Sequence, residues 1–262
     1  MKEGNQVAGK SRLHYGWIVV FTGFLVTVGA HGFGRLAYPI ILPAMRDGLN
    51  LNYTQLGLLG TGNFVGYLIM ALVGGMLAAR FGTRLVIALA LVLMGVTMLL
   101  TGLAQGFGWA LAMRFLTGLG NGASFVPAMA LGSAWFAVKR RGFATGVVSA
   151  GIGGGIMISG LIVPPILEAY GAQGWRFSWY YLGGLVLLIA GLAALFIRNH
   201  PEDMGLGQVG TDGPAPGPKA EPGGSAPLDW ASIYKMDLTK SFMIPCRPIL
   251  RPSSGEYILA TP

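Results

Sequence analysis

Long apolar runs separated by short polar connections set the pattern of this chain. A helix needs about 20 residues to cross a hydrocarbon core of roughly 30 Å, and six runs reach that length. The predicted spans lie at about 16–44, 54–78, 85–104, 109–136, 143–169 and 178–197. Because the connections are short, successive helices must run antiparallel. We therefore predict an all-α integral membrane protein with a six-helix bundle over residues 16–198.

The composition agrees with a membrane protein. The 262 residues are 53% hydrophobic and only 11% charged, against roughly 25% charged residues in soluble domains. The net charge of +8 would suit nucleic acid if it formed a basic soluble face, but the cations lie in short clusters between apolar runs. We expect membrane lipid around the chain and no nucleic-acid partner. The single cysteine, Cys246, cannot form an internal disulfide or a cysteine metal site, and we expect no metal and no cofactor.

The distribution of Lys and Arg predicts the orientation, because cytoplasmic loops carry the excess of cations. With the N-terminus inside, the outside connections hold only Arg46 and Arg176. The cytoplasmic segments hold Lys2, Lys10, Arg12, Arg80, Arg84, Lys139, Arg140, Arg141 and Arg198. We predict a multi-pass protein of the cell inner (plasma) membrane with both termini in the cytoplasm. The cations at 139–141 would anchor this topology.

The two ends of the chain differ from the bundle. Residues 1–15 are predicted to be a cytoplasmic N-terminus. From about Asn199 the chain is rich in Gly, Pro and acidic residues and lacks apolar periodicity, which is typical of disorder. We predict a disordered, Gly/Pro-rich cytoplasmic tail over 199–262, with no further span.

Two arginines within the predicted spans are the first candidates for function. A cation at mid-membrane costs about 2.5–3.5 kcal/mol on insertion scales, so Arg35 and Arg114 must face a cavity or a partner. His31, Arg35 and Tyr38 are spaced i, i+4 and i+7, which places them on one face of an α-helix. We expect Arg35 to bind a carboxylate as a charge-assisted pair, with Tyr38 or Asn63 completing the hydrogen bonds. The alternative is that Arg35 snorkels to water near the outer end of the span.

The fourth span repeats the polar pattern with Arg114, Thr117, Asn121 and Ser124. Asn121 is a further candidate for substrate contact. Arg114 either contacts substrate or supports packing and gating. His31 either carries a proton, since histidine titrates near neutrality, or is a buried neutral side chain bonded to a backbone carbonyl.

The fifth span is rich in glycine. Small residues let membrane helices approach closely, and Gly146, Gly151, Gly155 and Gly160 recur at spacings of five, four and five. We predict that this helix packs closely against its neighbours.

Three motifs, in order and each on its predicted helix or loop, resemble those of the major facilitator superfamily. The loop GMLAARFGTR is similar to G-x-x-x-D-R-x-G-R-K, with Ala79 in place of the acid. The fourth span resembles R-x-x-x-G-x-G. The fifth resembles the antiporter motif G-x8-G-x3-G-P, with Pro164 in place of its last glycine. The matching residues are Gly75, Arg80, Gly82, Arg84, Arg114, Gly118, Gly120, Gly151, Gly160 and Pro165.

A subfamily resemblance comes from the start of the fifth span. WFAVKRRGFATGVVSAG resembles the monocarboxylate porter signature Y-F-x-K-R-R-x-x-A-x-G-x-x-x-x-G. The companion signature before the first span survives only as Tyr15, Gly16 and Trp17, and Arg35 stands where monocarboxylate porters carry a lysine. RNHPEDMGLG, after the sixth span, also looks like bacterial members of this group, which includes oxalate–formate antiporter-like proteins.

This resemblance implies a fold and a mechanism. The six helices would form two inverted three-helix repeats whose first helices line a central cavity. The chain would be half of a twelve-helix secondary active transporter for small organic anions such as monocarboxylates. Transport would proceed by alternating access, as an antiporter or symporter driven by an ion such as the proton or by a counter-substrate. The loop at 75–84 would gate the cytoplasmic side.

Other functions remain to be weighed. The sequence has no G-x-S-G, H-E-x-x-H, Walker or dinucleotide motif, so we expect no enzyme. One bundle supplies only half of the superfamily's cavity. The chain would then be a truncated or frameshifted product, a homodimer that rebuilds a twelve-helix carrier, or a scaffold without transport. A carrier of another small solute is a further alternative.

Overall fold

The computed structural model describes residues 14–210, and the predictions for residues 1–13 and 211–262 lie outside that range. The described chain is helical almost throughout. Its main elements are α1 (Tyr15–Thr27), η1 (Val28–Leu36), α2 (Tyr38–Leu49), α3 (Tyr53–Phe81), α4 (Thr83–Gly102), α5 (Phe107–Trp135), α6 (Val138–Tyr170), η2 (Gly171–Gln173), α7 (Gly174–Phe196) and η3 (Pro201–Met204).

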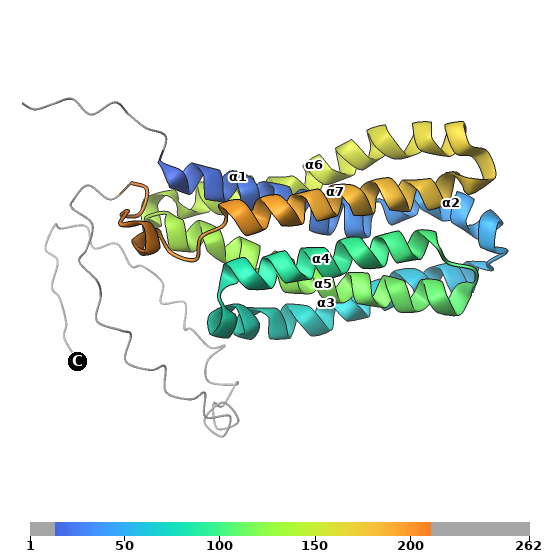
Figure 1. Ribbon diagram of the computed structural model, residues 1–262, viewed down its shortest axis with the longest axis horizontal. Helices are drawn as coiled ribbons and strands as arrows, with labels where there is room; N and C mark the ends of the chain where they lie inside the picture. The colour runs from blue at the N-terminus through green and yellow to red at the C-terminus, as the bar shows by residue number, and fades with distance from the viewer. Residues whose placement is uncertain (1–13, 211–262) are drawn as a thin grey trace, which may run out of the picture. The chain divides into compact units, whose positions relative to one another are not determined.

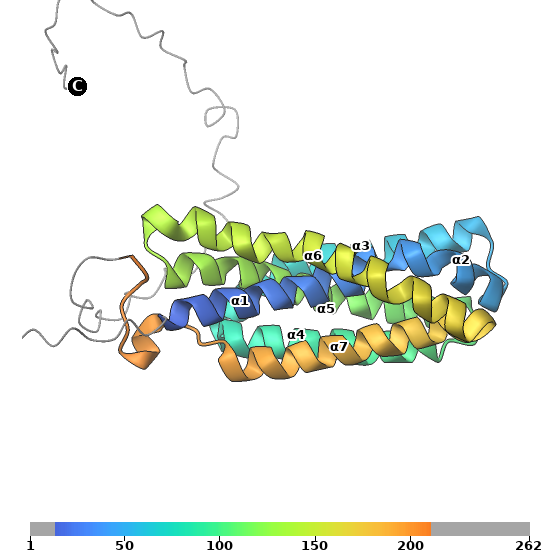
Figure 2. The same cartoon turned by 90° about the horizontal axis from the view of Figure 1, so that it is seen from above.

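Successive long helices run in opposite directions (Figures 1 and 2). The start of α1, the α3–α4 and α5–α6 connections and the end of α7 lie at one end of the bundle. The end of α2, the α4–α5 connection and the α6–α7 connection lie at the other. The first of these ends, called the basic end below, carries Arg80, Arg84, Lys139, Arg140, Arg141 and Arg198. The antiparallel order therefore follows the prediction.

Four helical segments are long and apolar enough to cross a membrane: Tyr15–Leu49, Tyr53–Phe81, Thr83–Gly102 and Val138–Phe196. The last of these contains both α6 and α7. Helix α5 is long but is not among the four; it carries Arg114 and Asn121 in its middle. The fold is thus all-α with apolar membrane-spanning segments, while the count of six spans and their inverted repeats stay predictions.

The first predicted span is longer than expected and is not a uniform α-helix. Between α1 and α2 the chain forms the π-helical segment η1, VGAHGFGRL. A π-helix bonds residue i to i+5 rather than i+4, so it changes which side chains share a face. Pro39 sits in the first turn of α2, where its missing N–H costs no helical hydrogen bond.

Two connections are shorter than predicted, because the helices begin earlier than the apolar runs do. Helix α6 begins at Val138, so Lys139, Arg140 and Arg141 lie in its first turn and not in a loop. Helix α7 begins at Gly174, and Trp175 in its first turn is only 1% exposed. Trp175 is therefore a packed side chain that lies against α2 near Gly48.

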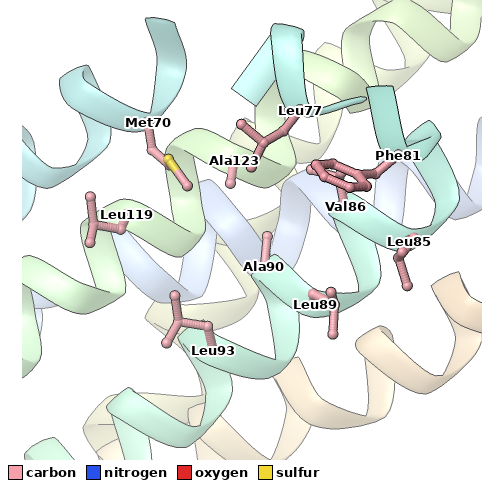
Figure 3. Close-up of a pocket in the computed structure, with 10 residues that line it drawn as sticks. All are labelled: Met70, Leu77, Phe81, Leu85, Val86, Leu89, Ala90, Leu93, Leu119 and Ala123. Carbon is pink, nitrogen blue, oxygen red and sulfur yellow. The ribbon is translucent and has the colours of Figure 1, made fainter. Parts of the chain in front are cut away.

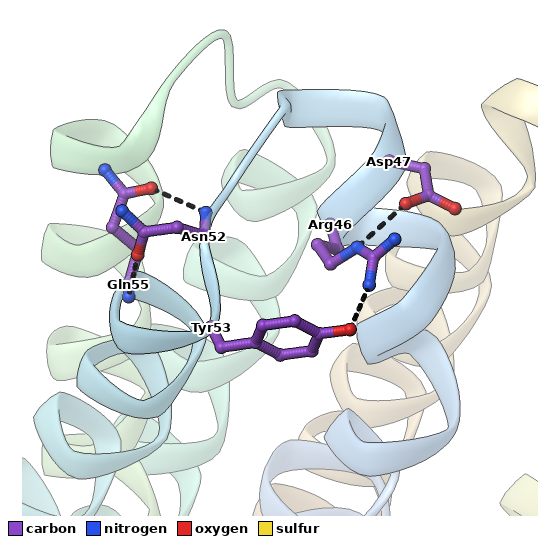
Figure 4. Close-up of polar contacts among 5 residues, drawn as sticks. All are labelled: Arg46, Asp47, Asn52, Tyr53 and Gln55. Carbon is purple, nitrogen blue, oxygen red and sulfur yellow. Dashed lines mark hydrogen bonds and ion pairs between the residues drawn. The ribbon is translucent and has the colours of Figure 1, made fainter.

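The α2–α3 connection is held by reciprocal caps (Figure 4). The Gln55 backbone N–H donates to the Asn52 side chain at 2.8 Å, and the Asn52 backbone N–H donates to the Gln55 side chain at 3.0 Å. Beside this capping box, Arg46 donates to Asp47 at 2.9 Å and to the Tyr53 hydroxyl at 2.6 Å. The start of α3 is thereby fixed by its own sequence.

Replacing Asn52 with alanine should lower the free energy of unfolding by about 1 kcal/mol, because the Gln55 N–H loses its acceptor. Thermal unfolding of the purified protein in detergent would measure this loss. Thr54→Ala is the control, because Thr54 is an exposed residue between Asn52 and Gln55. It should leave the midpoint of unfolding unchanged. An Asn52 variant as stable as the parent would show that the cap contributes nothing.

The segment after α7 turns back to the α5–α6 connection. Val209 donates its backbone N–H to the Trp135 carbonyl at 3.0 Å, and the Ala137 N–H donates to the Val209 carbonyl at 3.2 Å. The Trp135 indole donates to the Arg198 carbonyl at 3.1 Å. These bonds give residues 199–210 a defined backbone, so the structured chain continues past the predicted start of the disordered tail at 199.

Candidate functional site

Arg35, the predicted anion-binding residue, lies at the end of η1 against two aromatic rings of α3. Its guanidinium carbon is 4.8 Å from the ring centre of Phe64 and 5.0 Å from that of Tyr67. Such cation–π contacts offset part of the cost of placing a cation in an apolar region. Within residues 14–210 the structure gives Arg35 no ion pair, and its side chain is partly exposed. The charge of Arg35 is therefore uncompensated on this part of the chain.

His31 lies beside one of these two rings, Tyr67, and beside a third, Phe125. Its imidazole is 5.6 Å from the Tyr67 ring centre and 4.2 Å from that of Phe125. The side chain is 7% exposed, and its Nδ1 has no hydrogen-bond partner among the described residues. The expected bond from this nitrogen to a backbone carbonyl is thus not formed, and a buried polar atom is left unsatisfied next to Arg35's aromatic partners.

Arg114 belongs to a different cluster. It is 1% exposed, and its guanidinium donates to the Gly34 carbonyl at 2.9 Å. Its guanidinium carbon lies 4.6 Å from the Tyr38 ring centre and 5.1 Å from that of Trp179. Arg114 therefore ties α5 to the first span and to α7. This arrangement supports packing, the second of the two roles predicted for it.

Tyr38 makes no cation–π contact or hydrogen bond with Arg35 within residues 14–210, although an α-helical spacing would place the two on one face. Its ring contacts Arg114, and its hydroxyl donates to the Leu56 carbonyl at 2.9 Å. The cause is η1, since π-helical turns shift every later side chain around the helix axis relative to an α-helix. Tyr38 is 6% exposed, and its one polar group is already used.

Asn63 and Asn121 both bond to the backbone of a neighbouring helix. The Asn63 amide donates to the Arg114 carbonyl at 3.0 Å, and the Asn121 amide donates to the Ala30 carbonyl at 2.7 Å. Both side chains are almost fully buried. These bonds hold α3 to α5 and α5 to η1, and they leave contact of either residue with a substrate as a prediction.

The glycines of the R-x-x-x-G-x-G motif explain the packing around α5. A Cβ on Gly118 would meet the Asn63 carbonyl of α3, and a Cβ on Gly120 would lie 2.6 Å from the Ala90 carbonyl of α4. Alternate glycines therefore let α5 approach two helices at once. The motif residue that precedes them, Arg114, lies one turn away and on the side of η1.

The predicted glycine face of α6 is confirmed in part. A Cβ on Gly155 would lie 2.6 Å from the Gly32 Cα of η1, and one on Gly151 would meet the Phe24 carbonyl of α1. Gly146 and Gly160 have no atom within 4 Å of such a Cβ, so neither packs against the described chain. Pro165 is also exposed. In the antiporter motif, Gly151 therefore packs against α1, whereas Gly160 meets no described neighbour and Pro165 is exposed.

The loop motif at 75–84 is a single-residue turn. Helix α3 ends at Phe81, with Arg80 in its last turn, and α4 starts at Thr83. Gly82 links them with φ of +87°, a conformation that a side chain would strain. Gly75, about two helical turns before Gly82, lines a cavity of about 380 Å³ together with Gly82 and Pro127.

Asn199, three residues after the end of α7, caps this turn. Its side-chain oxygen accepts the Arg84 backbone N–H at 2.9 Å, and the Arg84 guanidinium donates to the Ala194 carbonyl at 2.7 Å. An N-terminal cap of α4 is normally supplied by a residue next to it in sequence. Here the motif's acidic position is Ala79, and the side-chain amide of Asn199, 115 residues after Arg84, supplies a hydrogen bond to the same turn.

Asn199→Ala should destabilise the α3–α4 turn by about 1 kcal/mol, the usual value of a helix cap. Hydrogen–deuterium exchange should report faster exchange of the amides at the start of α4, with unchanged rates in α6. Asn199→Asp keeps the acceptor oxygen and should restore protection. Equal exchange in the alanine variant and the parent would rule out this cap.

A cavity of about 440 Å³ between α3, α4 and α5 is unsuited to an anion (Figure 3). All ten side chains that line it are apolar: Met70, Leu77, Phe81, Leu85, Val86, Leu89, Ala90, Leu93, Leu119 and Ala123. Removing a carboxylate from water into such surroundings without a hydrogen bond or a counter-charge is strongly unfavourable. Within residues 14–210 no group of His, Cys, Asp or Glu side chains is arranged to hold a metal ion.

Sequence reasoning missed the aromatic partners of both arginines. Phe64, Tyr67 and Phe125 contact Arg35 or His31, and Trp179 contacts Arg114. Aromatic residues are common in apolar spans, so their positions alone carried no signal. The i, i+3 spacing of Phe64 and Tyr67 does place them on one face of α3, which would have revealed the pair.

The chain is similar in sequence to three transporters that are named for different compounds. The chain is 31% identical over 169 residues to a probable sulfoacetate transporter of Cupriavidus necator, covering 64% of this chain and 38% of that protein. It is 31% identical over 210 residues to a hexuronate transporter of Bacillus subtilis, with coverage of 79% and 47%. It is 30% identical over 182 residues to a 4-hydroxybenzoate transporter of Acinetobacter baylyi, with coverage of 70% and 39%. The chain therefore spans less than half the length of these relatives.

The fold has solved counterparts. A bacterial homologue of the human lysosomal transporter Spinster, crystallised in an inward-facing and unoccupied conformation, matches with a TM-score of 0.63 and 21% identity, over 72% of this chain and 44% of that one. At this identity the likeness concerns the fold alone. The model of the Major Facilitator Superfamily matches residues 23–244. This chain therefore belongs to the Major Facilitator Superfamily.

Proposed function

We propose that this chain supplies the anion-binding half of a secondary active transporter for small organic anions. The observation that carries the proposal is Arg35, a partly exposed guanidinium without an ion pair in the described chain. Arg114, by contrast, is buried and bonded to a backbone carbonyl. The names of the three relatives all refer to organic acids, which supports an anion as the solute. Monocarboxylates are one class within that group.

The remaining parts of the mechanism are proposals drawn from the family and from charge. Six spans in two inverted repeats would place η1 and α5 beside a central cavity, and alternating access would expose that cavity to either side. The cation-rich basic end would lie in the cytoplasm with both termini. The turn at 75–84, held by Asn199, would gate that side. His31, buried and with Nδ1 unsatisfied, is the candidate for proton coupling.

Two assays on the full 262-residue chain test the proposal. Equilibrium binding in lipid nanodiscs should detect at least one of sulfoacetate, glucuronate, 4-hydroxybenzoate and lactate, and uptake into proteoliposomes should show whether binding leads to transport. Binding without uptake supports a half-carrier that needs a second bundle. Binding with uptake supports a self-assembling carrier, for which cross-linking should reveal a dimer. A folded protein that binds none of these anions contradicts the proposal.

A further inference from the structure

An aromatic wall, formed by Phe64, Tyr67 and Phe125, borders Arg35 and His31. Phe64 and Tyr67 are stacked, with ring centres 6.2 Å apart, and the Arg35 guanidinium lies over both. Phe125 extends the wall on the side of His31, 4.2 Å from its ring centre. We infer that the anion held at Arg35 is an aromatic carboxylate, an inference that rests on the anion-binding function proposed above.

The first step of the argument is the position of the wall relative to the charge. Both ring centres lie about 5 Å from the guanidinium carbon of Arg35. A carboxylate that binds this guanidinium must therefore place its first carbon atoms beside the aromatic wall. An aromatic ring there gains edge-to-face or offset-stacked contacts. The hydroxyl groups of a sugar acid would instead lose hydrogen bonds to water against ring surfaces that offer none in return.

The second step concerns His31. Its Nδ1 is buried and lacks a partner within residues 14–210, and its ring meets the same Tyr67 ring that Arg35 contacts. Buried polar atoms normally have a hydrogen-bond partner, and an imidazole nitrogen can donate or accept according to its tautomer. A hydroxyl on the bound aromatic ring would supply that partner once the side chains that enclose Nδ1 move aside, since this atom is buried in the structure. A hydroxybenzoate would then bind through its carboxylate at Arg35 and its hydroxyl at His31.

The third step is access. Phe64 is 45% exposed, and Arg35, Tyr67 and Phe125 are partly exposed. The wall is therefore reachable from outside the described bundle. The apolar cavity between α3, α4 and α5 includes neither arginine, so it does not compete as the place for this ligand.

The test compares two hydroxy acids of similar size, one with an aromatic ring and one with a saturated ring. The full chain in lipid nanodiscs is titrated with tritiated 4-hydroxybenzoate, which is then competed with unlabelled 4-hydroxybenzoate or 4-hydroxycyclohexanecarboxylate. The aromatic acid should compete about 3–10-fold more strongly, the value of one or two good aromatic contacts. Phe64→Leu should remove most of that preference. Phe21→Leu, at a similarly exposed phenylalanine of α1, is the matched control and should keep it.

The outcomes distinguish a failure of this inference from a failure of the proposed anion-binding function. Equal competition by the two acids would overturn the aromatic inference and leave anion binding intact. A preference that survives Phe64→Leu would also overturn it, since the wall would not be its source. If labelled 4-hydroxybenzoate does not bind a folded protein but an aliphatic acid does, the inference alone fails. If no organic acid binds, the proposed function fails with it.

Discussion

Arg35→Ala should weaken organic-anion binding roughly tenfold to a hundredfold, because a hydrogen bond to a charged group contributes about 1.5–3 kcal/mol. Stability should change little, since Arg35 contributes no ion pair to the described fold and loses only its contacts with Phe64 and Tyr67. Binding isotherms and thermal unfolding on the same preparation would measure the two effects separately.

Two further variants sharpen this experiment. Arg35→Lys keeps the charge but loses the planar fork that matches a carboxylate, so its affinity should fall between those of the parent and the alanine variant. Arg46→Ala removes an exposed arginine that is paired with Asp47 and should bind like the parent. Unchanged affinity in Arg35→Ala would remove Arg35 from the site, and equal losses in Arg35→Ala and Arg46→Ala would indicate a nonspecific charge effect.

Gly155→Ala should destabilise the protein, because it adds a methyl group where α6 crosses η1. The new Cβ would lie 2.6 Å from the Gly32 Cα and 2.8 Å from the Val28 carbonyl oxygen, and both obstacles are backbone. Overpacking of this kind typically costs 1–3 kcal/mol, against a gain of up to about 1 kcal/mol from the better helix propensity of alanine. The net change should therefore be destabilising, and thermal unfolding in detergent would show it as a lower midpoint.

Gly160→Ala is the matched control, because an added Cβ there meets no atom of the described chain within 4 Å. With no clash to offset the helix propensity of alanine, this variant should be as stable as the parent or slightly more so. A Gly155 variant that unfolds at the same temperature as the Gly160 variant would mean that α6 and η1 do not cross at this point.

The sequence was informative wherever one physical requirement dominated. The length of each apolar run predicted the long helices to within a few residues at most ends, because the thickness of a bilayer sets that length. Small residues in the fifth span predicted close packing, and Gly151 and Gly155 confirm it. Uncompensated charge singled out Arg35 and Arg114 before any geometry was known.

The sequence was uninformative where a local irregularity or a distant residue decided the outcome. The π-helical η1 precedes Tyr38, whose ring contacts Arg114 and not Arg35, and no periodicity rule for an α-helix anticipates that contact. The bond from Asn199 to the α3–α4 turn joins residues 115 positions apart, so no local pattern shows it. An added Cβ would meet the backbone of η1 at Gly155, but would meet no atom of the described chain within 4 Å at Gly146 or Gly160. The sequence alone does not show which of these glycines has a neighbour.

The pairing of Val209 with Trp135 and Ala137 has a consequence for the order of biosynthesis. Translation proceeds from the N-terminus, so the α5–α6 connection enters the bilayer long before residue 209 leaves the ribosome. Until then the Ala137 N–H and the Trp135 carbonyl lack these partners, and water or lipid headgroups must satisfy them. The basic end of the bundle therefore reaches its final hydrogen bonding only after α7 has been inserted, which makes it the last part of the described fold to mature.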